Sequence, residues 1–118
     1  MTKARSDPWF DPADMPYIAS YYCSAEQLRN PLVSPVYADM SGLPPVYIQV
    51  GSDEILLSDS TRTAEAIKTA GGEVDLEIWP GMWHVFQAFV HQMPESAAAI
   101  DKIGAYVRHA VTSVAATP

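Results

Sequence analysis

The 118-residue sequence has one cysteine, few basic residues and no long apolar run. Cys23 alone cannot form an internal disulfide or build a zinc site. Seven Lys and Arg residues stand against fourteen Asp and Glu residues, and the formal charge of −7 argues against nucleic acid and anionic membrane surfaces as partners. No apolar run approaches the roughly 20 residues of a membrane span, and the first residues do not form a secretory signal. The single cysteine and the lack of a signal fit a cytoplasmic protein. The sequence also has no phosphate-binding loop and no metal-spaced cluster, so we expect no cofactor and no metal.

The residues that are present predict one α/β domain. Hydrophobic residues make up 48% of the chain and charged residues 18%, a composition typical of a packed core rather than of disorder. Apolar periodicity and helix-capping residues predict helices over about 12–23, 58–70 and 95–115. Apolar runs predict strands over about 45–51 and 73–79, which would form a βαβ unit of parallel strands.

The two predicted strands differ in pattern. The first is almost entirely apolar, which predicts burial on both faces, as in a parallel sheet. The second alternates, so that Val74, Leu76 and Ile78 would face the core while Asp75 and Glu77 face solvent. A two-stranded sheet is marginal by itself, and we therefore expect residues 1–118 to form part of a larger domain.

One acidic residue and one histidine follow the predicted strands. Asp53 comes just after the first strand and His84 just after the second. Neighbouring parallel strands lie roughly 4.8 Å apart, so these side chains can meet at one edge of the sheet. Such a pair fits the acid and base of a catalytic triad. The spacing alone leaves a second reading open, in which Asp53 caps a turn and His84 packs beside Trp83.

Four segments together resemble a known family. Residues 43–57, Leu43-Pro44-Pro45 through Gly51-Ser52-Asp53-Glu54 to Leu57, are similar to the late-strand segment of α/β-hydrolases, and more narrowly of hormone-sensitive-lipase-like esterases. Residues 31–35, 70–72 and 79–86 match in the same order, so that the resemblance spans about residues 7–112. It implies that Asp53 is the triad acid and His84 the base of an esterase, lipase or lactonase acting on small-molecule esters. Glu54 receives no role, because adjacent residues in a loop usually diverge.

The nucleophile of that family is missing from the sequence. None of the ten serines lies in a Gly-x-Ser-x-Gly elbow, and there is no His-Gly-Gly-Gly oxyanion loop. The resemblance therefore implies that residues 1–118 correspond to the carboxyl-terminal half of such an enzyme and are inactive alone. The alternative is a hydrolase remnant that acts as a binding or self-associating module. Its partner would be an amino-terminal half or a second copy joined through residues 73–79.

Overall fold

The computed structural model describes the backbone of residues 7–115 and the side chains of residues 7–112. The chain divides into two compact units, Met1–His84 and Val85–Pro118, which are described in turn. Within the described residues, no helix is long and apolar enough to cross a membrane.

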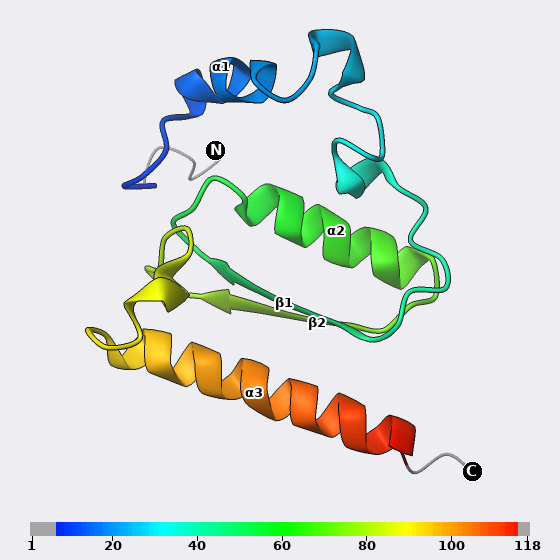
Figure 1. The fold of residues 1–118 in the computed structure, drawn as a ribbon, viewed down its shortest axis with the longest axis vertical. Helices are drawn as coiled ribbons and strands as arrows, with labels where there is room; N and C mark the ends of the chain where they lie inside the picture. The colour runs from blue at the N-terminus through cyan, green and yellow to red at the C-terminus, as the bar shows by residue number, and fades with distance from the viewer. Residues whose placement is uncertain (1–6, 116–118) are drawn as a thin grey trace. The chain divides into compact units, whose positions relative to one another are not determined.

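The first unit is a βαβ arrangement preceded by short helices (Figure 1). In chain order its elements are η2 (Pro12–Asp14), α1 (Met15–Ser20), η3 (Ala25–Gln27), η4 (Pro35–Tyr37), β1 (Val46–Gly51), α2 (Leu57–Thr69) and β2 (Val74–Trp79). Both strands and the central helix are confirmed to within a residue or two. The helix predicted over 12–23 is shorter, because η2 and α1 together end at Ser20 and single turns carry the chain on to Cys23.

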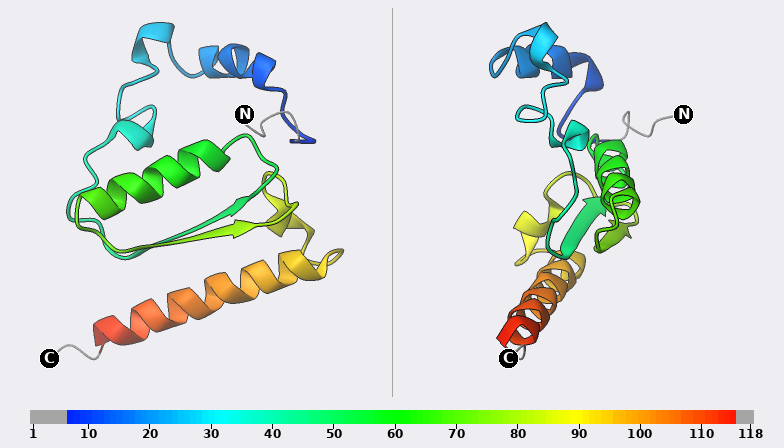
Figure 2. Two further views of the ribbon diagram at one scale, coloured as in Figure 1. Left: turned by 180° about the vertical axis from the view of Figure 1, so that it is seen from behind. Right: turned by 90° about the vertical axis from the view of Figure 1, so that its right-hand side faces the viewer.

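The two strands pair in parallel and end together. Val46 lies opposite Val74 at one end, and Gly51 lies opposite Trp79 at the other. Helix α2 runs along the strand pair (Figure 2) and contacts both strands, with Ala64 and Ile67 as its buried residues. Because the strands finish at the same level, the loops that follow them start next to each other.

The end of α2 follows its sequence signal. Gly71 has a φ of +80°, a left-handed value that a residue with a side chain adopts only at a cost. The amide of Gly72 donates to the carbonyl of Ile67 at 2.9 Å, and the amide of Gly71 donates to that of Lys68 at 3.0 Å. These are the bonds of a Schellman motif, and they direct the chain into β2.

The burial of β2 differs from the predicted alternation. Ile78 is 44% exposed, whereas Glu77 is half-buried. The cause is a hydrogen-bonded cluster across the strands. The Tyr47 hydroxyl donates to Glu77 Oε2 at 2.5 Å, and Gln49 Nε2 donates to the Tyr47 hydroxyl oxygen at 2.8 Å. These hydrogen bonds thus allow the acidic side chain of Glu77 to be half-buried, although the sequence pattern predicts that it faces solvent.

This cluster makes stability depend on pH in the alkaline range. The pKa of Tyr47 is raised, first because burial disfavours the phenolate and second because the hydroxyl donates to Glu77. The unfolded chain has a tyrosine pKa of about 10, and the folded protein has a higher one. The Tyr47 hydroxyl therefore contributes its full stability below about pH 10 and loses that stability as the pH rises through the folded pKa. We expect the difference in urea midpoint between wild type and Tyr47→Phe to shrink between about pH 8 and about pH 11. A constant difference would contradict this role of Tyr47.

The second unit consists of η5 (Phe86–Phe89) and α3 (Pro94–Ala115). The long carboxyl-terminal helix is confirmed, beginning one residue earlier than predicted. Ser96, in its first turn, is fully buried and its hydroxyl donates to the carbonyl oxygen of Phe86 at 2.7 Å. This bond ties η5 to the start of α3.

Candidate active site

The loops that follow the two strands are bonded to each other. We call residues 52–56 the first loop and residues 80–84 the second loop. The amide of Ser52 donates to the carbonyl of Trp79, the last residue of β2, at 2.9 Å, and the amide of Asp53 donates to the carbonyl of Met82 in the second loop at 3.0 Å. At Gly51 a Cβ atom would lie 2.1 Å from the Met82 carbonyl oxygen. The loops therefore approach as closely as they do only because residue 51 is a glycine.

The side chain of Ser52 adds a second connection. Its Oγ accepts a hydrogen bond from the Gly81 amide at 2.8 Å and donates one to Asp53 Oδ1 at 3.0 Å. Gly81 has a φ of +72°, which turns the chain sharply after β2. Ser52 thus fixes both the turn of the second loop and the side chain of Asp53.

Removing this hydroxyl should loosen the second loop. For Ser52→Ala we expect a loss of about 0.5–1 kcal/mol in the free energy of unfolding, because the exposed Gly81 amide exchanges its protein acceptor for water. Faster hydrogen exchange at the Gly81 amide would locate the change in the loop. Ser41→Ala, which alters an exposed residue outside both loops, is the control and should leave that exchange rate unchanged.

The carboxylate that reaches His84 belongs to Glu54. Glu54 Oε1 lies 3.4 Å from His84 Nδ1, and Glu54 Oε2 accepts a hydrogen bond from the Gly51 amide at 2.9 Å. The Glu54 side chain is 7% exposed and that of His84 is 26% exposed. A buried carboxylate, held by a backbone amide, thus faces one nitrogen of a half-buried imidazole.

The structure therefore separates the two acidic residues of the first loop. It brings Glu54 to His84, and it brings Asp53 to the hydroxyl of Ser52. The expectation that adjacent loop residues diverge holds, but the sequence does not say which of the two turns inward. No local pattern distinguishes the two, because the partner that Glu54 meets, His84, lies 30 residues along the chain.

Val85 sets the direction in which the chain leaves the histidine. It has a φ of 49° and a ψ of 33°, a left-handed conformation that is unusual for a β-branched residue. Phe86, the next residue, is fully buried, which favours a core role for its ring. Among the described residues, no group of three His, Cys, Asp or Glu side chains is arranged to hold a metal ion.

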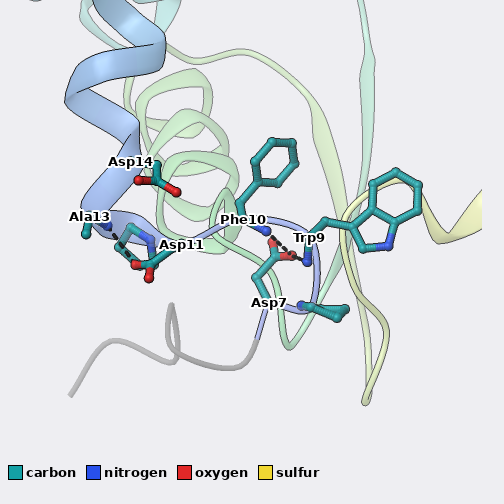
Figure 3. Close-up of a pocket in the computed structure, with 8 residues that line it drawn as sticks. Asp7, Trp9, Phe10, Asp11, Ala13 and Asp14 are labelled. Carbon is teal, nitrogen blue, oxygen red and sulfur yellow. Dashed lines mark hydrogen bonds between the residues drawn. The ribbon is translucent and has the colours of Figure 1, made fainter.

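A pocket lies beside these loops. Residues 7–14, which we call the entry segment, line a cavity of about 740 Å³ (Figure 3). Among the lining residues is Phe10, whose ring also packs edge-on against His84, with centroids 5.3 Å apart and planes at 71°. Three lining side chains are carboxylates, Asp7, Asp11 and Asp14. The aromatic wall of the pocket therefore reaches the histidine, and its polar lining is acidic.

Comparison with known proteins shows the family to which the chain belongs. A sequence profile of the α/β-hydrolase fold matches residues 1–88. An acetyl-hydrolase of Streptomyces hygroscopicus is 38% identical over 109 residues, which are 92% of this chain and 36% of that protein. The crystal structure of a hormone-sensitive lipase from a metagenome library superposes with a TM-score of 0.85, at 42% identity over 92% of this chain and 37% of its own.

A second solved structure gives the same result. An esterase from the bacterial hormone-sensitive lipase family superposes with a TM-score of 0.89, at 40% identity over 94% of this chain and 37% of its own. The chain thus spans somewhat more than a third of the length of these proteins. It belongs to the α/β-hydrolase fold family and is hormone-sensitive-lipase-like within it.

Proposed function

We propose that this chain supplies the general base and the acid of a carboxylic-ester hydrolase, with His84 as the base and Glu54 as the acid. The observation that carries the proposal is the 3.4 Å approach of a buried Glu54 carboxylate to His84 Nδ1, beyond the carboxyl ends of two paired parallel strands. Open α/β sheets place their sites at this edge. Hydrogen bonds of an acid–base pair are often long before substrate binds, so 3.4 Å suits the role. The names of the relatives, acetyl-hydrolase and esterase, support the reaction class.

Each residue would have a distinct part in the reaction. With Glu54 at Nδ1, the imidazole keeps its proton on that nitrogen, and Nε2 takes the proton of an attacking serine hydroxyl. His84 then returns that proton to the leaving alcohol, and the acyl-enzyme is hydrolysed by the same route with water. Glu54 stabilises the imidazolium that forms in both steps, and its bond to the Gly51 amide prevents it from turning away.

The serine nucleophile would come from outside these 118 residues. The sequence contains no Gly-x-Ser-x-Gly, and Ser52 is engaged with Gly81 and Asp53 in the loop interface. An acid–base pair without a nucleophile and an oxyanion site cannot form an acyl-enzyme. The 118-residue chain by itself should therefore not turn over esters.

A hybrid protein tests the proposal. In it, this chain replaces the 109-residue span that it matches in the Streptomyces hygroscopicus acetyl-hydrolase, and the rest of that protein supplies the serine. We expect the hybrid to hydrolyse a short-chain chromogenic ester and to lose this activity with His84→Ala. A folded hybrid without activity, beside an active parent, would contradict the role of His84 as base. Turnover by the 118-residue chain alone that His84→Ala abolishes would contradict an external nucleophile.

A second candidate function is an assembly module. Within residues 7–115 the sheet consists of β1 and β2, so each strand has an unpaired edge, and Ile78 on β2 is 44% exposed. A second copy of the chain could pair through β2. Sedimentation of the 118-residue chain distinguishes the assembly module from the acid–base function. A monomer, unchanged by Ile78→Lys, would argue against the module, whereas a dimer that this substitution disrupts would favour it.

A further inference from the structure

We propose that Asp7 is a positioning residue for the acid–base pair, holding the first loop and the ring of Phe10 in place around His84 and Glu54. The proposal rests on the proposed function for its catalytic consequence. The placement itself can be tested without any activity.

The carboxylate of Asp7 joins two distant parts of the first unit. Its Oδ1 accepts from the amides of Trp9 at 2.8 Å and Phe10 at 3.3 Å. Its Oδ2 accepts from the amide of Ile55 at 2.9 Å, a residue 48 positions along the chain. A carboxylate has acceptor sites on both oxygens, so one side chain can hold amides from two parts of the chain at once.

Two of the amides that Asp7 accepts from belong to residues next to, or in contact with, the two members of the acid–base pair, Glu54 and His84. Ile55 follows Glu54 directly, so the Asp7 bond anchors the peptide that carries the acid. The Gly51 amide holds the same glutamate at its side-chain end. On the other side, Asp7 holds the turn that places the Phe10 ring against the imidazole of His84. One side chain thus restrains the acid through its backbone and the base through an aromatic contact.

The comparison with Asp11 shows why Asp7 is more than a turn residue. Asp11, in the same entry segment, accepts from the amide of Ala13 at 2.8 Å and caps η2. That bond stays within its own turn, as an ordinary capping bond does. Asp7 makes the same type of local bond with one oxygen and a long-range bond with the other. Asp11→Ala is therefore a matched control, since it removes a capping carboxylate without touching either loop.

The first experiment measures placement in the 118-residue chain by NMR. For Asp7→Ala we expect exchange of the Ile55 amide to accelerate about tenfold or more, because it loses its acceptor. The His84 ring-proton resonances should also shift as the Phe10 ring leaves them. Asp11→Ala should change neither. Asp7→Asn retains a single acceptor oxygen and should give values between wild type and Asp7→Ala. If Asp7→Ala does not fold, the same two measurements on Asp7→Asn decide whether Asp7 positions the pair.

The second experiment measures the consequence in the hybrid esterase. Asp7→Ala should lower kcat about tenfold to a hundredfold with KM changed less than about twofold, because a misplaced pair slows proton transfer more than it weakens binding. Unchanged Ile55 exchange and unchanged His84 resonances in both Asp7 variants would overturn the proposal. So would an effect of Asp11→Ala equal to that of Asp7→Ala. An inactive wild-type hybrid would instead contradict the proposed function, and the NMR result would still decide the role of Asp7.

Discussion

Glu54→Ala in the hybrid esterase is expected to lower kcat about 10⁴-fold, the magnitude found when the acid of a hydrolytic triad is removed. Without the carboxylate, His84 would lose the group that, in the proposed mechanism, holds its tautomer and stabilises the imidazolium. His84→Ala should cost at least as much, since it removes the base itself. KM should change little, because Glu54 is 7% exposed and lies behind the imidazole rather than against substrate.

The neighbouring aspartate is the matched control. Asp53→Ala removes a carboxylate of the same loop whose Oδ1 accepts from the Ser52 hydroxyl. We expect this change to lower kcat by less than about tenfold, through looser packing of the two loops. Circular dichroism and thermal unfolding of both variants show whether the fold survives. If Asp53→Ala removes activity and Glu54→Ala spares it, the acid is Asp53, as the resemblance alone implies.

Gly51→Ala is expected to have the largest effect on folding. The added Cβ atom would lie 2.1 Å from the Met82 carbonyl oxygen and 2.5 Å from its carbon, which are backbone atoms that cannot rotate aside. The second loop would have to move, breaking the bond from the Asp53 amide to the Met82 carbonyl. We expect a loss of about 3 kcal/mol or more in the free energy of unfolding, measured by urea denaturation of the chain.

Two other glycines separate this clash from ordinary glycine effects. Gly42 and Gly71 have φ values of +71° and +80°, and a Cβ at either would meet nothing within 4 Å. Alanine there should cost roughly 1–2 kcal/mol, from left-handed strain alone. Equal losses at Gly42, Gly71 and Gly51 would show that the close approach of the loops does not govern stability. In the hybrid, Gly51→Ala should also remove activity, because the Gly51 amide holds Glu54.

The sequence predicts those features of the fold that depend on neighbouring residues. The apolar run before Gly51 and the alternating run before Pro80 are recognisable as strands, and Gly71-Gly72 marks the end of α2. Together they place Asp53, Glu54 and His84 in loops at one edge of the sheet, because parallel strands end at the same side. This much of the candidate site follows from periodicity and turn chemistry.

The remaining features depend on contacts between distant residues. The approach of Glu54, rather than Asp53, to the imidazole depends on the position of His84, 30 residues away. The half-burial of Glu77 depends on the Tyr47 hydroxyl across the strand pair. The bond from the Ile55 amide to Asp7 joins the entry segment to the first loop. No local pattern encodes such pairings, so a sequence read segment by segment cannot supply them.

The pairing of His84 with Glu54 can be measured directly by NMR of the imidazole nitrogens in the 118-residue chain. We expect Glu54→Gln to move the Nδ1 resonance of His84 and to change the balance between its two neutral tautomers, because the carboxylate at Nδ1 is lost. Asp53→Asn should leave both as in wild type. The opposite result, a His84 signal that responds to Asp53→Asn and ignores Glu54→Gln, would contradict the assignment of Glu54 as the acid.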